Sequence, residues 1–335
     1  MLTEKQLRET DVRQWPELRK EFEGAELVLG NGFSIKLAAQ FSYSSLFEKF
    51  LTRCDPAARK LFAGLDTTNF EEIQRLLLDA KRVAELLDSP LAGIDGHVNS
   101  LREGLINVIH DSHPRAAEID KDRLQEISKD LDVFGDIFTT NYDLFLYHII
   151  MICKDRGEKD PGVRPYNDYF WNRVSGKFLE FMGFQNYKHY KHAYFLHGAL
   201  FIFPGPPLGR ELKLRRGDDW ELLDAIDDLI RAGDLPLFVT EGTARQKMRA
   251  ITQSAYLRFA MDKLGKARES LLIYGCALGD PDRHVVNALN SQRRSLAVSI
   301  YVGEKTQEAI EAEVKAIRGK LGRHDVVVFD SRGLF

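Results

Sequence analysis

The sequence predicts an α/β fold with a Rossmann-like, mostly parallel sheet of about six to seven strands, flanked by helices and carrying an inserted helical subdomain. Two observations lead to this prediction. Short apolar runs without alternation, typical of strands buried on both faces, recur along the chain, and segments of helical character separate them. At 335 residues the chain is long enough to bury a large core, and we expect residues 1–335 to form a single domain.

Seven segments are predicted to be strands. Most of them are continuous apolar runs, and helical segments separate them, as in parallel sheets with helical crossovers. The predicted strands are residues 26–30, 136–140, 194–198, 236–240, 271–275, 297–302 and 325–330. The carboxyl ends of such strands border the crevice in which α/β proteins bind ligands.

The helices are predicted from apolar spacing and from boundary signals. Thr243 and Gln246 have the spacing of a capping box, and apolar residues recur at helical intervals from there to Phe259. The last helix is predicted at about residues 305–321, and it ends near Gly322. The segment 203–209 is the one clear loop rich in proline and glycine.

Two insertions interrupt the predicted alternation of strands and helices. Residues 45–132 have helical patterns throughout, and they are far longer than the dozen or so residues that a crossover needs. They are therefore predicted to form a helical subdomain. Residues 150–192 are predicted to be a second helical insertion, whose many aromatic residues are dense enough to cover a cleft.

Composition excludes several classes of protein. A formal charge of -3 gives no overall preference for nucleic acid or anionic lipid. Three widely spaced cysteines argue against a disulfide framework and cannot form a four-cysteine zinc site, which favours a reducing compartment. The charged N-terminus lacks a signal-peptide core, and no run of about 18 apolar residues occurs. We expect a cytoplasmic protein without a membrane segment.

The first candidate motif is a glycine loop, "LVLGNGFS", directly after the first predicted strand. Gly30 and Gly32 would let the backbone approach a pyrophosphate, and the amides that open the following helix would face it. Ser34 completes the loop. The third glycine of the dinucleotide fingerprint is missing, and a tight turn explains the glycines equally well.

The second motif, "DIFTTNYD", ends the strand at 136–140. Asn141 and Asp143 would point into the ligand crevice from the carboxyl end of a parallel strand. Both residue types are also good helix caps, so either side chain could simply cap the next helix. The motif alone favours the cap.

Two further strand ends carry polar residues. His197 terminates a predicted strand in "YFLHG" and Gly198 follows it, although a single histidine there is more often structural. Gly275 ends the strand before "CALGDPDRHV", which presents Asp282 and His284. For this last motif the alternative is a helix start with Asp282 near the positive end of the helix dipole.

The order of these four motifs resembles the sirtuin superfamily. Its Gly-Ala-Gly loop ending in serine is matched by Gly30, Gly32 and Ser34, with Asn31 in place of alanine. The substitution leaves the position of the pyrophosphate open. The family's zinc ribbon of paired Cys-x-x-Cys motifs has no counterpart here, so no zinc is expected and deacylation of peptides is disfavoured.

The rest of the resemblance concerns the reaction. The family's Thr-x-Asn-x-Asp motif is matched by Thr139, Asn141 and Asp143, and its catalytic histidine is matched by His197. The spellings "FTTNYD", "LHG" and "GCALGDPDRH" look like the bacterial sirtuin-like NAD hydrolases of anti-phage defence, over roughly residues 25–303. The chain is thus expected to be a single sirtuin-like Rossmann domain.

The resemblance implies an NAD+ glycohydrolase that releases nicotinamide and ADP-ribose. Nicotinamide leaves as a neutral molecule, so the two opposed carboxylates of ordinary glycosidases are not needed. The implied catalytic residues are Asn141 and His197, with His197 titrating near neutrality as general base. The implied residues of the NAD+ site are Gly30, Asn31, Gly32, Ser34, Thr139, Asp143, Gly275, Asp282 and His284, of which Asp143 would lie at the nicotinamide end.

Other functions remain open from the sequence. The fold could serve as a module that binds NAD+ or ADP-ribose without cleaving it, or as a protein deacylase or ADP-ribosyltransferase. Metal sites at His110 and His113, or at His189 and His192, lack a third ligand nearby. The basic and aromatic segment 187–195 is compatible with nucleic acid, but the edge of the second insertion explains it better.

Partners follow from the need to restrain an enzyme that consumes NAD+. After the sheet and insertions are counted, only about twenty-five N-terminal residues remain for a sensor. We therefore expect control by self-assembly into a homo-oligomer or by a separate protein. As family members often do, the chain would act with an ATPase or another phage-sensing partner.

Overall fold

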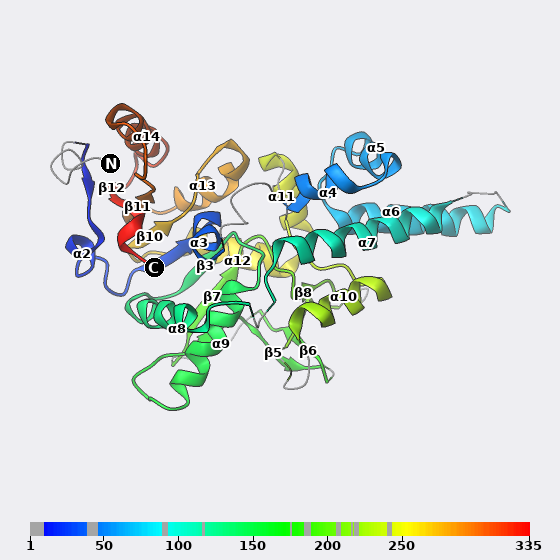
Figure 1. Cartoon of the computed structure of the whole chain (residues 1–335), viewed down its shortest axis with the longest axis horizontal. Coiled ribbons are helices and arrows are strands. Elements are labelled where there is room, and N and C mark those ends of the chain that lie inside the picture. The colour runs from blue at the N-terminus through cyan, green and yellow to red at the C-terminus, as the bar shows by residue number, and fades with distance from the viewer. Residues whose placement is uncertain are drawn as a thin grey trace.

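The computed structural model describes residues 10–38, 46–88, 93–115, 118–174, 176–183, 189–205, 209–215, 217, 221–239 and 243–335. The fold is α/β and Rossmann-like in general character, as predicted, and it is built on a sheet of eight strands (Figure 1). All paired neighbours in this sheet are parallel. Across the sheet the strands are β1 (Val12–Arg13), β12 (Asp325–Asp330), β11 (Ser295–Ile300), β10 (Leu271–Tyr274), β2 (Glu26–Leu29), β3 (Ile137–Thr139), β7 (Lys191–Phe195) and β4 (Tyr166–Asn167).

The central strands are apolar because both of their faces are covered. Leu27, Val28 and Leu29 of β2 are fully buried. No residue of β10 exposes more than 2% of its surface. In a parallel sheet the crossover helices cover both faces, so a strand has no solvent-facing side that would select polar residues. This is why the strands appear in the sequence as continuous apolar runs.

Helices pack around the sheet. Figure 1 shows α13 and α14 above the strands and α8 and α9 below them. No helix of the described residues combines the length and the apolar character needed to cross a membrane. The helices outside the first insertion are α2 (Trp15–Leu18), α3 (Asn31–Leu37), α9 (Phe145–Gly157), α10 (Leu222–Ala232), α11 (Ala244–Gln253), α12 (Ala255–Lys266), α13 (Arg283–Leu289) and α14 (Gln307–Lys320). Short 3-10 turns lie at η2 (Leu131–Val133), η3 (Asp280–Asp282) and η4 (Ser331–Gly333).

The predicted insertion 45–132 is helical in its described part. It contains α4 (Leu46–Arg53), α5 (Pro56–Gly64), α6 (Phe70–Leu86), α7 (Ile94–Ser112) and α8 (Lys121–Asp130). The helices α6 and α7 pack side by side and extend away from the sheet (Figure 1). A cluster of phenylalanine rings in edge-to-face contact joins α4, α5 and α6 at the base of this extension.

The prediction that residues 150–192 form a helical insertion is wrong beyond Gly157, where α9 ends. The segment continues into β4, β5 (Phe170–Arg173) and β6 (Phe178–Phe181). Together with β9 (Leu212–Leu214) and β8 (Ile202–Phe203), β5 and β6 form a second, antiparallel sheet in the order β5-β6-β9-β8. Its aromatic residues favour strands, and Phe170 and Phe181 pack against Tyr256 of α12. Residues 175 and 184–188 lie outside the described residues.

Two other predictions differ in detail from the structure, and two are confirmed. Residues 236–239 form no strand and contribute only an isolated bridge between Phe238 and Gly198, and residue 240 lies outside the described residues. Pro236 has no amide hydrogen for a ladder there. The helix predicted from Thr243 to Phe259 is interrupted at Ser254, whose hydroxyl caps α12. The capping box of Thr243 and the last helix, α14, are confirmed.

Two further segments singled out in the sequence, residues 203–209 and 187–195, lie only partly within the described residues. Of the loop 203–209, residues 206–208 lie outside the described residues. Of the basic and aromatic segment 187–195, Tyr194 and Phe195 are buried in β7. Their rings therefore pack in the core of the sheet, and they are not available to stack on the bases of a nucleic acid.

Candidate functional site

The last residues of four strands lie side by side in the sheet. Tyr274 of β10 pairs with Leu29 of β2, and Leu29 pairs with Thr139 of β3. Thr139 pairs in turn with Phe195 of β7. Because all four strands run in the same direction, the loops that follow them begin at the same level along one edge of the sheet. The four polar motifs of the sequence therefore meet there.

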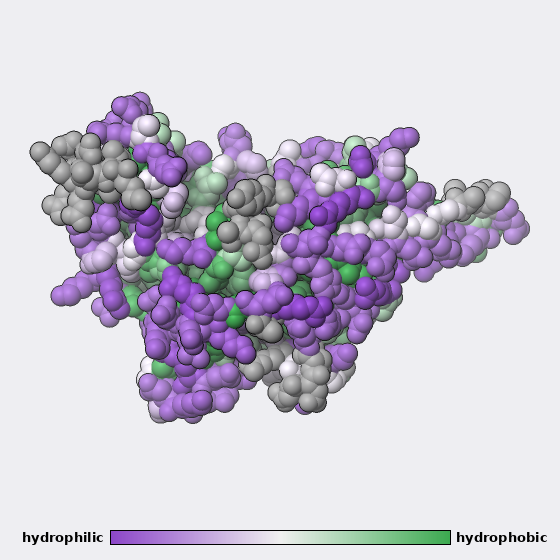
Figure 2. Space-filling model, in the orientation of Figure 1, coloured by the Kyte–Doolittle hydropathy of each residue, from purple (hydrophilic) through white to green (hydrophobic). Residues whose placement is uncertain are grey.

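A cavity of about 1060 Å³ lies at this edge. Its volume is at the upper end of the range of small-molecule sites, roughly 300–1,000 Å³. Figure 2 shows a mostly hydrophilic face with hydrophobic residues visible near its centre, close to α3. The predicted site residues that line the cavity are Gly30, Asn31, Gly32, Asn141, Asp143, His197, Gly275 and Asp282. The other three, Ser34, Thr139 and His284, are buried behind this lining.

The cavity lies where the order of the strands reverses. From β2 the chain proceeds to β3 and β7 on one side of the sheet, and it later returns to β10 on the other side of β2. Ligands of open α/β sheets bind at such a reversal.

The glycines of the candidate site bring two loops into direct contact. A Cβ atom on Gly32 would lie 2.6 Å from Cα of Gly275, and one on Gly30 would lie 2.6 Å from the Gly275 carbonyl oxygen. The Gly275 backbone has φ of +68°, and its carbonyl accepts a hydrogen bond from the Gly32 amide at 2.9 Å. Close packing between the loops after β2 and β10 thus requires these glycines. Their predicted contact with a pyrophosphate stays a prediction.

Asn141 ties the β3 loop to the glycine loop. Its side-chain nitrogen donates to the Gly30 carbonyl at 2.9 Å and to the Ser34 hydroxyl at 2.8 Å. Because the Gly30 carbonyl is an acceptor only, the amide orientation is determined: nitrogen towards the β2 loop, and Oδ1 left as an acceptor. Asn141 is 8% exposed and lines the cavity. It does not cap the helix α9.

Asp143 joins the start of α9 to the same network. One carboxyl oxygen accepts a hydrogen bond at 2.9 Å from the Phe145 amide, the first of α9, whose N-cap position is held by Leu144. The other oxygen accepts from the Ser34 hydroxyl. Burial raises the pKa of Asp143, and the hydrogen bonds from Ser34 and Phe145 oppose that shift. Thr139 is the last residue of β3, and its hydroxyl donates to the Leu29 carbonyl at 3.3 Å.

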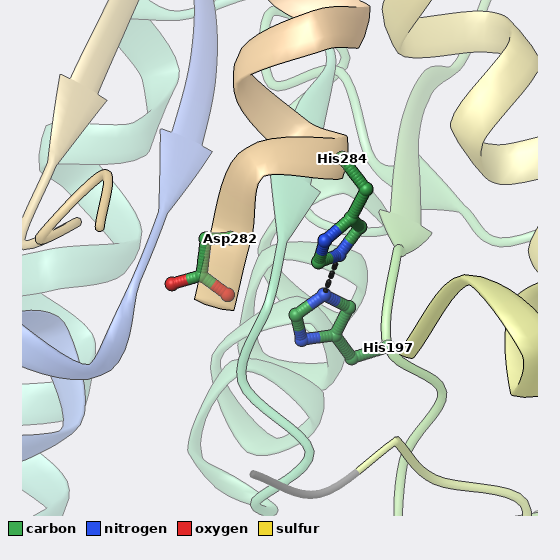
Figure 3. A group of neighbouring side chains, drawn as sticks. All are labelled: His197, Asp282 and His284. Atoms are coloured by element: carbon green, nitrogen blue, oxygen red, sulfur yellow. Dashed lines mark hydrogen bonds between the residues drawn. The ribbon is translucent and has the colours of Figure 1, made fainter. Parts of the chain in front are cut away.

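His197 and His284 form a buried pair. Their Nε2 atoms are 2.7 Å apart, and Figure 3 shows the rings meeting end to end between β7 and α13. Burial holds the pKa of His197 well below its usual value, and His284 and Lys247 add to the shift. Burial likewise lowers the pKa of His284 to about 4. The expectation that His197 titrates near neutrality is therefore not met, because its ring is removed from water.

Lys247 was not predicted as a site residue. It lies on α11, is 7% exposed, and donates to Asp282 of η3 at 2.7 Å. Only two residues of α11 are buried, Lys247 and Ile251, which follows it by four positions. This spacing placed Lys247 on the inward face of the helix, and it was the one signal that could have identified it.

One group of potential metal ligands occurs in the described part of the chain. His197, Asp282 and His284 offer ligand atoms within 4.8 Å of one another. However, the Asp282 carboxylate already binds the Lys247 ammonium, and the two histidines use their Nε2 atoms on each other. His110 and His192 contact Asp227 and Asp136 instead. The prediction that no metal is bound remains untested.

His113, at the end of α7, is expected to make the protein sensitive to acid. Burial lowers its pKa from 6.5 to about 3. Below pH 6.5 the unfolded chain takes up a proton at this ring and the folded chain does not, so the free energy of unfolding falls as the pH falls. Between pH 6.5 and 5 we expect the wild type to lose about 1.5 kcal/mol more stability than His113→Gln. Urea unfolding at both pH values measures the difference, and equal losses would contradict it.

Comparison with known proteins assigns the chain to a family. The model of the family described as "Domain of unknown function (DUF4917)" matches residues 27–333. No curated protein matches the chain. The matched segment begins within β2 and includes all four strand ends that border the cavity. The chain therefore belongs to the DUF4917 family, and the candidate site lies entirely within the part of the chain that defines it.

Proposed function

We propose that the protein is an NAD+ glycohydrolase, an enzyme that cleaves NAD+ to nicotinamide and ADP-ribose. The observation that carries the proposal is the placement of Asn141 and His197 on one cavity at the reversal of strand order. The cavity is large enough for a dinucleotide. It combines an amide oxygen with a histidine that is unprotonated at neutral pH.

These groups match the needs of the reaction. The nicotinamide ring of NAD+ is cationic, so it leaves neutral when the bond to C1 of the ribose breaks and the electron pair moves to the ring. No general acid has to protonate it, in contrast to ordinary glycosides. The site must instead stabilise the positive charge that develops on the ribose and accept the proton of the attacking water.

Asn141 and His197 divide these tasks. The Oδ1 atom of Asn141 is the negative end of an oriented dipole, and it stabilises positive charge at the ribose or positions a hydroxyl group. As water forms its bond to C1, its proton passes to the imidazole of His197. General base catalysis of this kind contributes typically about 10²- to 10⁴-fold. By the resemblance to the sirtuin superfamily, Asp143 would contact the nicotinamide end of NAD+ and Asp282 the ribose.

Two lysines support the binding of a dinucleotide. Lys36 of α3 and Lys49 of α4 both line the cavity. Lys36 has no ion-pair partner among the described residues, and Lys49 donates to the Ser112 hydroxyl at 3.1 Å. Both ammonium groups are therefore available to a pyrophosphate, whose charge they would partly neutralise. The helical insertion thus contributes directly to the proposed substrate site.

The setting of the reaction follows from the resemblance to anti-phage NAD hydrolases. We propose that the protein acts in the bacterial cytoplasm and depletes NAD+ during infection. It would do so as a homo-oligomer, or together with an ATPase or another phage-sensing partner. Activity that rises steeply with protein concentration would support control by self-assembly, whereas full activity of a dilute monomer would contradict it.

Nicotinamide release by the purified protein tests the proposal. We expect His197→Ala to lower the rate by about 10²- to 10⁴-fold, because the attacking water loses its base. His189→Ala is the matched control, because His189 is an exposed histidine that does not line the cavity. Thermal unfolding and ADP-ribose binding would confirm that both variants are folded. Tight binding of ADP-ribose without release at any protein concentration would replace the enzyme by a binding module.

A further inference from the structure

Lys247 of α11 and Asp282 of η3 form an ion pair in the wall of the cavity. The Lys247 ammonium donates to Oδ1 of Asp282 at 2.7 Å, and both residues line the cavity. The Asp282 carboxylate also has an oxygen within 4.8 Å of a ring nitrogen of His197, and Figure 3 shows it beside the histidine pair. The ion pair therefore lies next to the residue that the proposed reaction uses as its base.

The pair keeps hydrogen-bonding capacity that the described part of the chain does not use. The Lys247 ammonium carries three protons, yet Oδ1 of Asp282 is its one acceptor among the described residues, and Lys247 is only 7% exposed. Oδ2 of Asp282 accepts no hydrogen bond from these residues, and its side chain is 31% exposed. Buried polar groups are as a rule hydrogen-bonded, and the cavity is where a partner for this pair can enter.

Lys247 is held in place from two sides. Gln246, one position earlier, donates to the Asp66 carbonyl at 2.9 Å, and Arg249 forms an ion pair with Glu72 of α6. These contacts join α11 to the helical insertion, while Lys247 joins the same helix to η3. The position of the ammonium is thus fixed before a ligand arrives, which lowers the entropic cost of binding one.

A donor and an acceptor of opposite charge, side by side, suit a vicinal diol. Each hydroxyl of such a diol can donate and accept, so one can donate to the Asp282 carboxylate while its neighbour accepts from the Lys247 ammonium. A phosphate fits less well, because the carboxylate would repel it. Lys36 and Lys49 suit the phosphates better, since neither is paired with a carboxylate among the described residues.

We propose that Lys247 and Asp282 bind the two adjacent hydroxyl groups of the nicotinamide ribose, which makes Lys247 a substrate-binding residue. The inference rests on the proposed function, which places this ribose next to His197. An attacking water lies about 3 Å from its base and about 3 Å from C1. A carboxylate within 4.8 Å of His197 can therefore reach a hydroxyl of the same sugar. Because the charges of the pair offset each other, Lys247 adds little net positive charge beside the ribosyl cation.

Binding of ADP-ribose tests the assignment without the reaction. The probes are ADP-ribose and an analogue whose terminal sugar lacks both hydroxyl groups, and calorimetry measures their affinities. We expect the wild type to prefer ADP-ribose by about 100-fold, because two hydrogen bonds to charged groups are made. Lys247→Met keeps the apolar stem without the ammonium, so it should lower this preference about 10-fold and leave the affinity for the analogue unchanged.

Lys266→Met is the matched control. Lys266 pairs with Asp262 at 2.8 Å on the surface of α12, and neither residue lines the cavity. We expect this variant to keep the full preference of the wild type for ADP-ribose. Thermal unfolding would confirm that both variants are folded.

Kinetics with NAD+ give a second readout. The hydroxyl contact exists before and during the reaction, so Lys247→Met should raise KM about 10-fold and change kcat much less. The full preference for ADP-ribose in Lys247→Met would overturn the proposal, and so would a wild type that binds neither ligand or binds both equally. If the wild type releases no nicotinamide but its preference depends on Lys247, the hydrolase fails and the diol site stands. If NAD+ is cleaved without such a preference, only the diol site fails.

Discussion

Asn141→Ala is expected to lower nicotinamide release from NAD+ by about 10³-fold or more. The substitution removes the amide of a residue that lines the cavity, and the loss of one such oriented dipole costs about 10²- to 10³-fold. It also removes both hydrogen bonds from Nδ2 and leaves the buried Gly30 carbonyl and Ser34 hydroxyl without this donor. The glycine loop then loses its connection to the β3 loop, which adds to the loss.

Asn141→Asp sharpens this prediction. Aspartate has nearly the shape of asparagine, but it replaces the Nδ2 donor by an acceptor that faces the Gly30 carbonyl oxygen. If the network matters as proposed, this variant should be as inactive as Asn141→Ala and less stable. Asn172→Ala is the matched control, since its side-chain amide donates to Glu180 at 2.9 Å on the outer face of the second sheet. Undiminished NAD+ cleavage by a folded Asn141→Ala protein would remove Asn141 from the mechanism.

The sheet was predictable because its central strands are covered on both faces. Predicted and observed strands agree to within about a residue for β2, β3 and β10. The prediction for β7 is displaced by three residues, because its first residue is a buried lysine. The ammonium of Lys191 donates to the Leu131 and Asp132 carbonyls at 3.1 Å. A charge that is satisfied by distant backbone atoms does not look like the start of a buried strand in sequence.

The second insertion was misread for a related reason. Its aromatic residues are dense, and density alone does not distinguish a helix from a strand. Phe170 and Phe181 face the buried side of the antiparallel sheet, while their neighbours Trp171 and Glu180 are on the outer side. β9, which pairs with β6, and β8, which pairs with β9, are about 20 to 40 residues farther along the chain. Strand pairing at that distance is not visible in a local window.

Which residues of the candidate site were predictable depends on their distance in sequence. Asn141 follows one predicted strand and His197 terminates another, so the register of a parallel sheet brings them to one edge. Lys247 reaches Asp282 from a helix 35 residues earlier, and Lys49 reaches the cavity from the helical insertion. No periodic pattern specifies which face of a distant helix meets the edge of a sheet. These contacts therefore needed the folded structure.

The tightest constraint at the site is the contact between Gly275 and the glycine loop, and Gly275→Ala is expected to destabilise the protein by several kcal/mol. A Cβ atom on Gly275 would lie 2.7 Å from Cα of Gly32 and 2.8 Å from the Phe33 amide nitrogen. Both are backbone atoms of the first turn of α3, so neither can move away cheaply. Overpacking of this kind costs about 1–3 kcal/mol, and the left-handed φ of +68° adds about 1–2 kcal/mol for alanine.

Two other glycines separate the components of this cost. Gly24 has φ of +79°, and a Cβ atom there would meet no described atom within 4 Å, so Gly24→Ala should show the backbone cost alone. Gly32 lacks a left-handed φ but has the 2.6 Å approach to Gly275, so Gly32→Ala should show the packing cost alone. Urea unfolding of the three variants should give Gly275→Ala a loss close to the sum of the other two, with NAD+ cleavage impaired in both Gly32→Ala and Gly275→Ala. A Gly275→Ala protein as stable as Gly24→Ala would mean that the two loops separate without cost, and the crevice at the strand reversal would then not depend on their contact.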